Sequence, residues 1–260
     1  MEAFLNNFEV VFLILCRVSG IFVSSPFYGS RTIPKSIKSV LVLFIALTMF
    51  PVINKIGFYK VPTAFLEYIL LIFQELGIGL IIGICATIVV NVFSISGGFY
   101  SLQMGIGMIN VIDPLAQVQV PILGQLLGII AVLIFLLCGA HHLLLIAVFK
   151  SYELLPAITI SSFGPLCKNI IDMFVNSFVL GFSIALPIIG IMYILDIAIG
   201  LCSKASPQMN IMILGWPLKI LIGFLTLAIL LPTLFSMGID IFDNLFNRIY
   251  KLLFEMGKAI

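Results

Sequence analysis

Charged residues are scarce in this chain of 260 residues. Lysine, arginine, aspartate and glutamate make up only 9% of the sequence, whereas soluble domains carry roughly 25%. Apolar residues make up 62%, and the mean hydropathy is +1.28. So few charges exclude an ordinary soluble enzyme, a disordered protein and a nucleic-acid binder with a basic face. The composition indicates a membrane protein.

The sequence also lacks the residue patterns of catalytic and metal sites. Its five cysteines are scattered without a C-x-x-C pair, and His141 and His142 are adjacent, so on a helix their side chains diverge by about 100°. We therefore interpret the histidines as hydrogen-bonded residues at an interface rather than as metal ligands. There is no nucleophile elbow and no phosphate-binding glycine loop. We predict no catalytic residue, no metal and no cofactor, and hence no enzyme.

Long apolar segments predict an all-α protein of the membrane sector. A helix needs about 20 apolar residues to cross a bilayer. Six segments approach or exceed this length, some of them kinked or forming hairpins: residues 10–27, 40–53, 64–93, 121–149, 173–201 and 211–235. Lysine and arginine are spread over the loops on both sides, so they do not orient the chain.

The carboxyl-terminal tail has a different pattern. From Ile241 onward, apolar residues recur every three or four positions with charged residues between them. This period predicts one amphipathic helix. It either lies on a membrane or a partner, or packs against the rest of the chain.

A few charged residues interrupt the apolar segments. At a lipid-facing helix centre each would cost about 2.5–3.5 kcal/mol, so they are expected to face protein, water or one another. The set is Arg17, Glu67, Glu75, Asp196 and Lys219. Asp196 and Lys219 fall on neighbouring predicted helices and could form an ion pair. Structural pairs or subunit interfaces are more plausible roles for these charges than a proton relay.

Proline and glycine mark further points along the same segments. Pro187, Pro217 and Pro232 are expected to interrupt or kink the last two long helices, because proline lacks a backbone donor. Gly79 and Gly83 lie four residues apart on one helix face, which permits close approach of another backbone.

The segment between the two central apolar stretches, residues 97–121, is rich in glycine and in large flexible side chains. Glycines allow unusual backbone conformations, Asp113–Pro114 favours a turn, and methionine adapts to irregular openings. A mobile loop of this composition could fill an opening, or it could be a connector that only packs. The residues on which this prediction rests are Gly105, Ile106, Met108, Ile109, Ile112, Asp113 and Pro114.

Several short blocks, in order along the chain, resemble the FliR family of flagellar type III export proteins. They are Ile33–Pro34 with Lys35 and Lys38, Leu102-Gln103-Met104-Gly105 before Asp113–Pro114, Ser151 with Leu155–Pro156, Ala185-Leu186-Pro187, and Pro207-Gln208-Met209-Asn210 before Gly215, Pro217, Leu218 and Lys219. The resemblance runs from about Arg17 to Gly223. One departure is Gly139–Ala140 before the histidine pair, where the family usually has Asn-Gly.

This resemblance implies a fold, partners and a role. The fold would be a single FliR-like unit, with residues 1–170 FliP-like, including loop 97–121, and residues 171–260 FliQ-like plus the tail. Its partners would be several copies of FliP and FliQ, then FlhA and FlhB, with no nucleic acid. The complex would pass unfolded flagellar subunits across the bacterial inner membrane at the basal body, with loop 105–121 as its plug.

Three other interpretations stay open. A homologue from a virulence injectisome would share the fold and much of the motif set, although Gly215–Lys219 and the LQMG block look more flagellar. A secondary transporter would use the buried charges as an ion site near the midplane of the membrane. An intramembrane hydrolase would be built on Asp113, His141 or Asp196.

Overall fold

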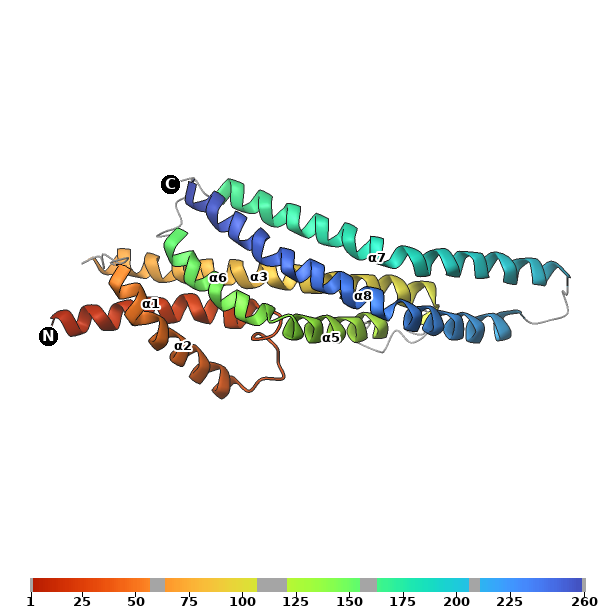
Figure 1. The fold of residues 1–260 in the computed structure, drawn as a ribbon, viewed down its shortest axis with the longest axis horizontal. Helices are drawn as coiled ribbons and strands as arrows, with labels where there is room; N and C mark the ends of the chain where they lie inside the picture. The colour runs from red at the N-terminus through yellow and green to blue at the C-terminus, as the bar shows by residue number, and fades with distance from the viewer. Residues whose placement is uncertain (1, 57–63, 107–120, 155–162, 206–210, 259–260) are drawn as a thin grey trace. The chain divides into compact units, whose positions relative to one another are not determined.

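The computed structural model describes residues 2–56, 64–106, 121–154, 163–205 and 211–258. Those residues form helices and contain no strand, which confirms the all-α prediction (Figure 1). The helices are α1 (Glu2–Ser24), α2 (Lys35–Ile56), α3 (Phe65–Gln103), α5 (Ile122–Leu137), α6 (Ala140–Leu154), α7 (Phe163–Ala205) and α8 (Ile211–Lys258).

Four of the described helices are long and apolar enough to cross a membrane. They are α2, α3, α7 and α8, and α5 with α6 would add a fifth span if the two cross together. α3, α7 and α8 have 39, 43 and 48 residues, about twice the 20 that a bilayer requires. The chain is a membrane protein, and its longest helices exceed one bilayer thickness.

The fourth apolar segment is not one helix, contrary to the prediction for residues 121–149. α5 ends at Leu137 and α6 begins at Ala140, with Gly139 between them at a φ of +68°. This left-handed conformation is open to glycine but strained for other residues. The Gly139 carbonyl oxygen accepts a hydrogen bond from the His142 amide nitrogen, 2.9 Å away, at the start of α6. A kink in some of the long segments was expected, and α5 and α6 are bent by 67°. The position of the break was not predicted, because one glycine in an apolar run leaves hydropathy unchanged.

The last two helices do not end at the prolines that were expected to interrupt or kink them. α7 contains Pro187, and α8 contains Pro217 and Pro232, without an end of helix at any of them. The amphipathic tail is likewise no separate element, because α8 runs on to Lys258.

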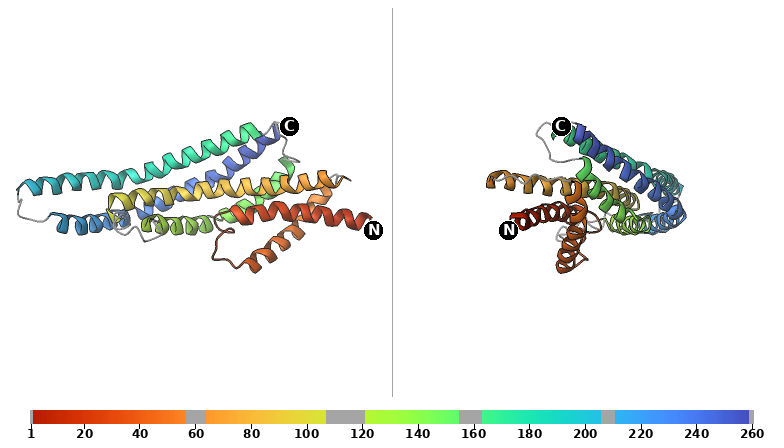
Figure 2. Two further views of the ribbon diagram at one scale, coloured as in Figure 1. Left: turned by 180° about the vertical axis from the view of Figure 1, so that it is seen from behind. Right: turned by 60° about the vertical axis from the view of Figure 1, so that its left-hand side comes forward.

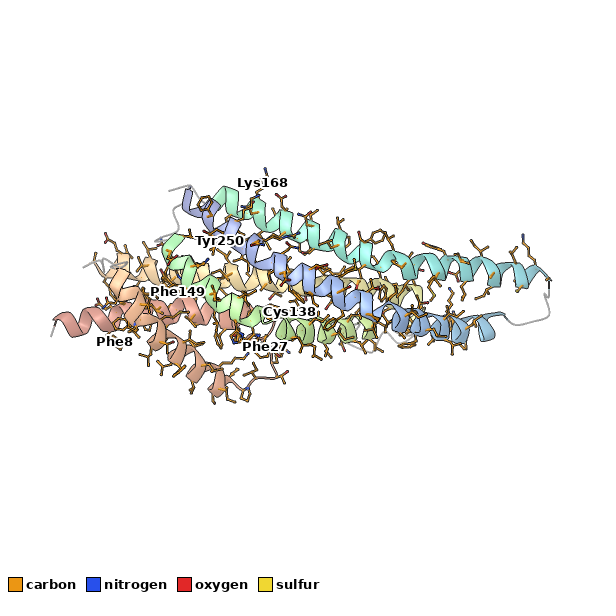
Figure 3. All side chains as sticks on the ribbon, viewed as in Figure 1. Phe8, Phe27, Cys138, Phe149, Lys168 and Tyr250 are labelled. Carbon is orange, nitrogen blue, oxygen red and sulfur yellow. The ribbon has the colours of Figure 1, made fainter. Side chains whose placement is uncertain are left out.

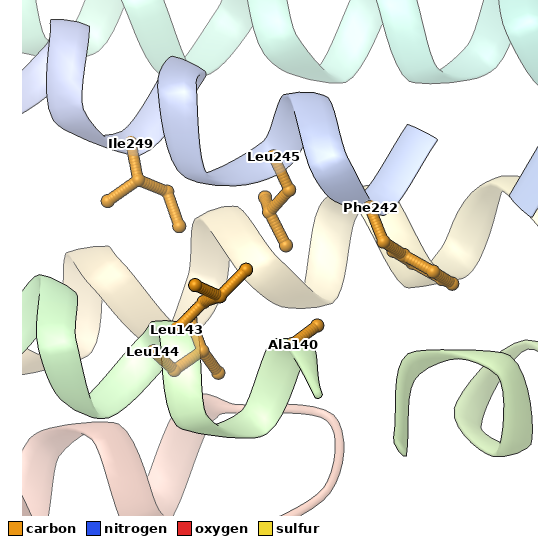
Figure 4. Close-up of a pocket in the computed structure, with 6 residues that line it drawn as sticks. All are labelled: Ala140, Leu143, Leu144, Phe242, Leu245 and Ile249. Atoms are coloured by element: carbon orange, nitrogen blue, oxygen red, sulfur yellow. The ribbon is translucent and has the colours of Figure 1, made fainter. Parts of the chain in front are cut away.

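The tail has the predicted amphipathic face, and that face packs inside the chain. Phe242, Leu245, Ile249, Leu252 and Leu253 are buried, while the charged residues between them are exposed. Leu245 and Ile249 point toward Leu143 and Leu144 of α6 in Figure 4. Of the two interpretations, packing against the chain is therefore the one that the structure supports.

The helices form two compact units, each built from separated parts of the sequence. The first unit comprises Met1–Val89, Leu136–Phe174 and Ile241–Ile260, and the second comprises Val90–Phe135 and Val175–Asp240. α3, α7 and α8 each contribute one part to each unit. The predicted FliP-like part (residues 1–170) and FliQ-like part (residues 171–260) were defined by resemblance to other proteins. The two compact units are defined by contacts within the chain and do not test that division, which stays a prediction.

Candidate functional site

The most buried polar cluster of the first unit surrounds Arg17 of α1. Its Nε donates to Glu75 Oε2 at 2.6 Å, and its Nη2 donates to Glu75 Oε1 at 2.9 Å. Its Nη1 donates to Ser151 Oγ at 2.8 Å, and the guanidinium lies 3.8 Å from the ring centroid of Tyr152. Arg17 and Glu75 are 0% and 1% exposed. One arginine therefore connects α1 with α3 and α6.

The geometry of this cluster suits arginine. Two parallel N–H groups meet the two carboxylate oxygens, a bidentate arrangement that lysine cannot make. The face of the guanidinium lies against an aromatic ring, where a cation is attracted to the ring electrons. The expectation that charges in apolar segments face protein or one another is fulfilled at this pair.

Close approach of two backbones brings α1 and α3 together beside the ion pair. A Cβ atom on Gly20 would lie 2.6 Å from the Leu76 carbonyl oxygen, and one on Gly79 would overlap the carbonyl of Arg17. A Cβ atom on Gly83 would likewise overlap the Ser24 side chain and lie 3.0 Å from the Ser25 amide nitrogen. The predicted role of Gly79 and Gly83 in close approach is thus present, with Gly20 as the partner that the sequence did not single out.

The chemistry of the cluster is structural. The Ser151 hydroxyl donates its proton to the Val148 carbonyl at 2.6 Å and accepts a hydrogen bond from Arg17. A serine nucleophile needs a base to take that proton, and here a backbone carbonyl holds it. Within the described ranges no three metal-binding side chains come together either. The contacts of Arg17 with Glu75 and Ser151 join three helices, which is a structural role.

The second charge pair, in the second unit, is the one that the sequence anticipated. Lys219 Nζ of α8 contacts Asp196 Oδ1 of α7, so the suggested ion pair is present. Their side chains are 21% and 39% exposed, so this pair is half-buried. Whether these four charges lie at subunit interfaces stays a prediction.

Most of the predicted plug lies outside the described residues. Gly105, just after α3, has a φ of +76°, and Ile106 is half-buried. Met108, Ile109, Ile112, Asp113 and Pro114 are not among the described residues, and neither are Pro207, Gln208 and Asn210 of the family motif. Pro217 of that motif is exposed in α8.

The histidine pair lies at the start of α6. The rings of His141 and His142 have centroids 4.0 Å apart, and the Tyr28 hydroxyl donates to the His141 carbonyl at 3.3 Å. Burial raises the pKa of Tyr28, which keeps this hydroxyl a donor. His141 Nδ1 is buried without a hydrogen-bond partner among the described residues, so the expected hydrogen bond to it is not found there.

The contact between α6 and the tail includes one further cation. Lys150 Nζ lies 5.2 Å from the ring centroid of Tyr250, which is labelled on α8 in Figure 3. Sequence reasoning missed this contact, as it missed Tyr152 beside Arg17. Both involve residues far apart in the chain, and only the fold brings them together.

Comparison with known proteins decides the family. The sequence model of a family described as "Bacterial export proteins, family 1" matches residues 8–245. The chain belongs to this family. Its match covers the Arg17 cluster, the Asp196–Lys219 pair and the predicted plug, so the site residues all lie within the export-protein region.

Three relatives of this export-family chain share a name. It is similar to "Flagellar biosynthetic protein FliR" of Bacillus subtilis, at 29% identity over 100% of both chains. It is also similar to the FliR protein of Escherichia coli, at 26% identity over 98% of this chain and 97% of the relative. The FliR protein of Aquifex aeolicus is 27% identical over 94% of this chain and 93% of the relative. The resemblance to the FliR family is thereby confirmed.

Proposed function

We propose that this chain is the FliR-type subunit of a flagellar protein export gate. It assembles with several copies of FliP and FliQ, next to FlhA and FlhB, in the bacterial inner membrane at the flagellar basal body. The complex passes unfolded flagellar subunits across that membrane. The observation that carries the proposal is the family match over residues 8–245, together with the flagellar names of full-length relatives.

The surface of the chain supports assembly with other apolar partners. In the most apolar windows of α7 and α8, only 33% and 22% of the residues are buried. Large apolar side chains stand out from both helices, such as Ile194 at 70% exposed and Ile229 at 72%. Apolar surface on this scale requires cover by lipid or by protein. Packing against other subunits of the complex would cover these side chains on helices that are longer than one bilayer thickness.

Loop 105–121 is assigned as the plug of the closed gate. Its composition supports the assignment, because glycine gives backbone freedom and methionine and isoleucine fill irregular apolar space. The loop follows Met104, which comes directly after α3 and is buried against Gly223 of α8. Its base is therefore fixed to the packed helices of the second unit.

The names of the relatives favour the flagellar role over the injectisome role. The transporter interpretation needs a charged site open to a solute. The Asp196–Lys219 pair is instead internally compensated, which supports a structural role for it.

The experiment that tests this proposal compares the intact complex with a plug variant. The tagged chain is purified with its accompanying membrane subunits and reconstituted in planar bilayers. We expect deletion of residues 106–114 to leave the complex assembled but to raise its ion conductance, because the pore loses its apolar filling. The control replaces Met104 with leucine, which keeps the apolar volume at the base of the loop.

Two results would count against the proposal. Unchanged conductance of an assembled deletion variant would refute the plug assignment. Saturable uptake of a small solute by the purified chain alone would refute the gate and favour a transporter.

A further inference from the structure

The first unit carries an open groove between α1 and α2. Its volume is about 540 Å³, within the range of roughly 300–1,000 Å³ that ligand pockets span. Figure 1 and the left view of Figure 2 both show α2 crossing α1 obliquely. The apolar side chains that line the groove are Leu15, Phe22, Val23, Val42 and Leu43. They form a surface suited to a hydrocarbon chain.

Two ammonium groups complete the lining of this groove. Lys35 begins α2 and Lys38 follows one turn later, and both line the groove. In the part of the chain that the structure describes, neither has a carboxylate within the 4.0 Å of an ion pair. The first turn of α2 has no acidic residue either. The positive end of the helix dipole and two lysines therefore coincide, and this arrangement favours an anion.

α2 itself is a helix suited to contact with lipid. Residues 35–54 are apolar enough to cross a membrane, yet only 17% of its most apolar window is buried within the chain. The lysines stand at the start of this candidate span, where a bilayer around it would change from headgroup to hydrocarbon. Lysines at helix ends commonly extend to the headgroup level, and basic pockets between membrane helices bind anionic lipid headgroups.

We propose that this groove binds one anionic phospholipid. Its phosphate would lie against Lys35 and Lys38, and an acyl chain would run along Phe22 and Val42. Along α2 the lining runs from Lys35 and Lys38 to Val42 and Leu43, so charged groups precede apolar ones, as the headgroup precedes the tail in a single lipid. A helix of a partner protein would have to supply both an anion and an apolar ridge at this spacing. The inference rests on the membrane helices and does not require the gate assignment.

The first test measures lipid retention by native mass spectrometry. The full chain, with its accompanying subunits, is released from detergent after equilibration with phosphatidylglycerol or with zwitterionic phosphatidylcholine. We expect one phosphatidylglycerol to be retained per chain. Affinity should fall roughly fivefold for Lys35→Gln or Lys38→Gln, and roughly 25-fold for the double variant. Lys204→Gln, at an exposed lysine outside the groove, should leave it unchanged.

A second variant tests the apolar part separately. Ser39 is exposed and lines the groove, so Ser39→Phe fills it with little risk to folding. The matched control is Ser183→Phe, because Ser183 is also exposed and its hydroxyl also donates to the carbonyl four residues earlier. We expect Ser39→Phe to abolish retention and Ser183→Phe to preserve it. Equal retention of both lipids, or equal loss in both serine variants, would overturn the proposal.

A photoreactive residue at position 39 decides between lipid and protein as the occupant. In native membranes, irradiation should attach a phospholipid to this chain. An adduct with another membrane subunit would show that a partner helix fills the groove, and the lipid proposal would then be wrong. Neither outcome changes whether the chain works in flagellar export, so this test and the test of the gate are independent.

Discussion

Replacing Glu75 with alanine should lower the free energy of unfolding by about 3–5 kcal/mol, one of the two largest losses expected for a single substitution here. The substitution leaves the Arg17 guanidinium without the carboxylate that it meets at 2.6 and 2.9 Å, in surroundings where it is 0% exposed. Removal of one partner from a buried pair strands the other charge, and that is the source of the loss. Equilibrium unfolding of the purified chain in mixed micelles measures it.

Two controls separate the stranded charge from other causes. Glu67→Ala removes an exposed carboxylate from the first turn of the same helix, and we expect a loss of at most about 1 kcal/mol, from its interaction with the helix dipole. The double replacement Arg17→Leu with Glu75→Leu removes both charges and should recover much of the loss, because a buried pair is often replaceable by apolar residues. A double variant that is less stable than Glu75→Ala would show that the pair itself stabilises the fold.

Replacing Gly79 with alanine should be the other strongly destabilising change. The new Cβ would overlap the Arg17 carbonyl and lie 3.2 Å from Gly20 Cα, so the α1 backbone must move away from α3. Overpacking of this kind costs about 1–3 kcal/mol, and here it also lengthens the hydrogen bonds between Arg17 and Glu75. We expect a loss near the upper end of that range, in the same unfolding assay.

Gly77 provides the matched control on the same helix. No atom lies within 4 Å of a Cβ at Gly77, so Gly77→Ala should stabilise the chain by up to about 1 kcal/mol through helix propensity. Equal effects of the two substitutions would mean that the crossing of α1 and α3 is looser than the structure shows.

The sequence predicted what depends on composition and short period. The long apolar runs predicted helices, which the structure contains. The spacing of three and four residues from Ile241 predicted the buried face of α8, and Gly79 with Gly83 predicted a close contact between helices. These features depend on residues within a few turns of each other. The family followed from short motifs in order along the chain, a signal that is independent of hydropathy.

Features that depend on the tertiary fold were not predicted in the same way. Arg17 and Glu75 are 58 residues apart, and Arg17 and Ser151 are 134 apart, so only packing pairs them. The break at Gly139 depends on one left-handed φ value, which a hydropathy pattern does not contain. α7 and α8 also continue through their prolines, which membrane helices tolerate where neighbouring groups satisfy the freed carbonyls.

The proposed role in flagellar export is tested most directly by secretion in the source bacterium. The gene is deleted in frame, and flagellar hook and filament subunits are measured in the culture medium and inside the cells. We expect loss of both subunits from the medium with retention inside the cells, and full recovery when the intact gene is restored. Normal amounts of flagellar subunits in the medium of the deletion strain would contradict the proposed role.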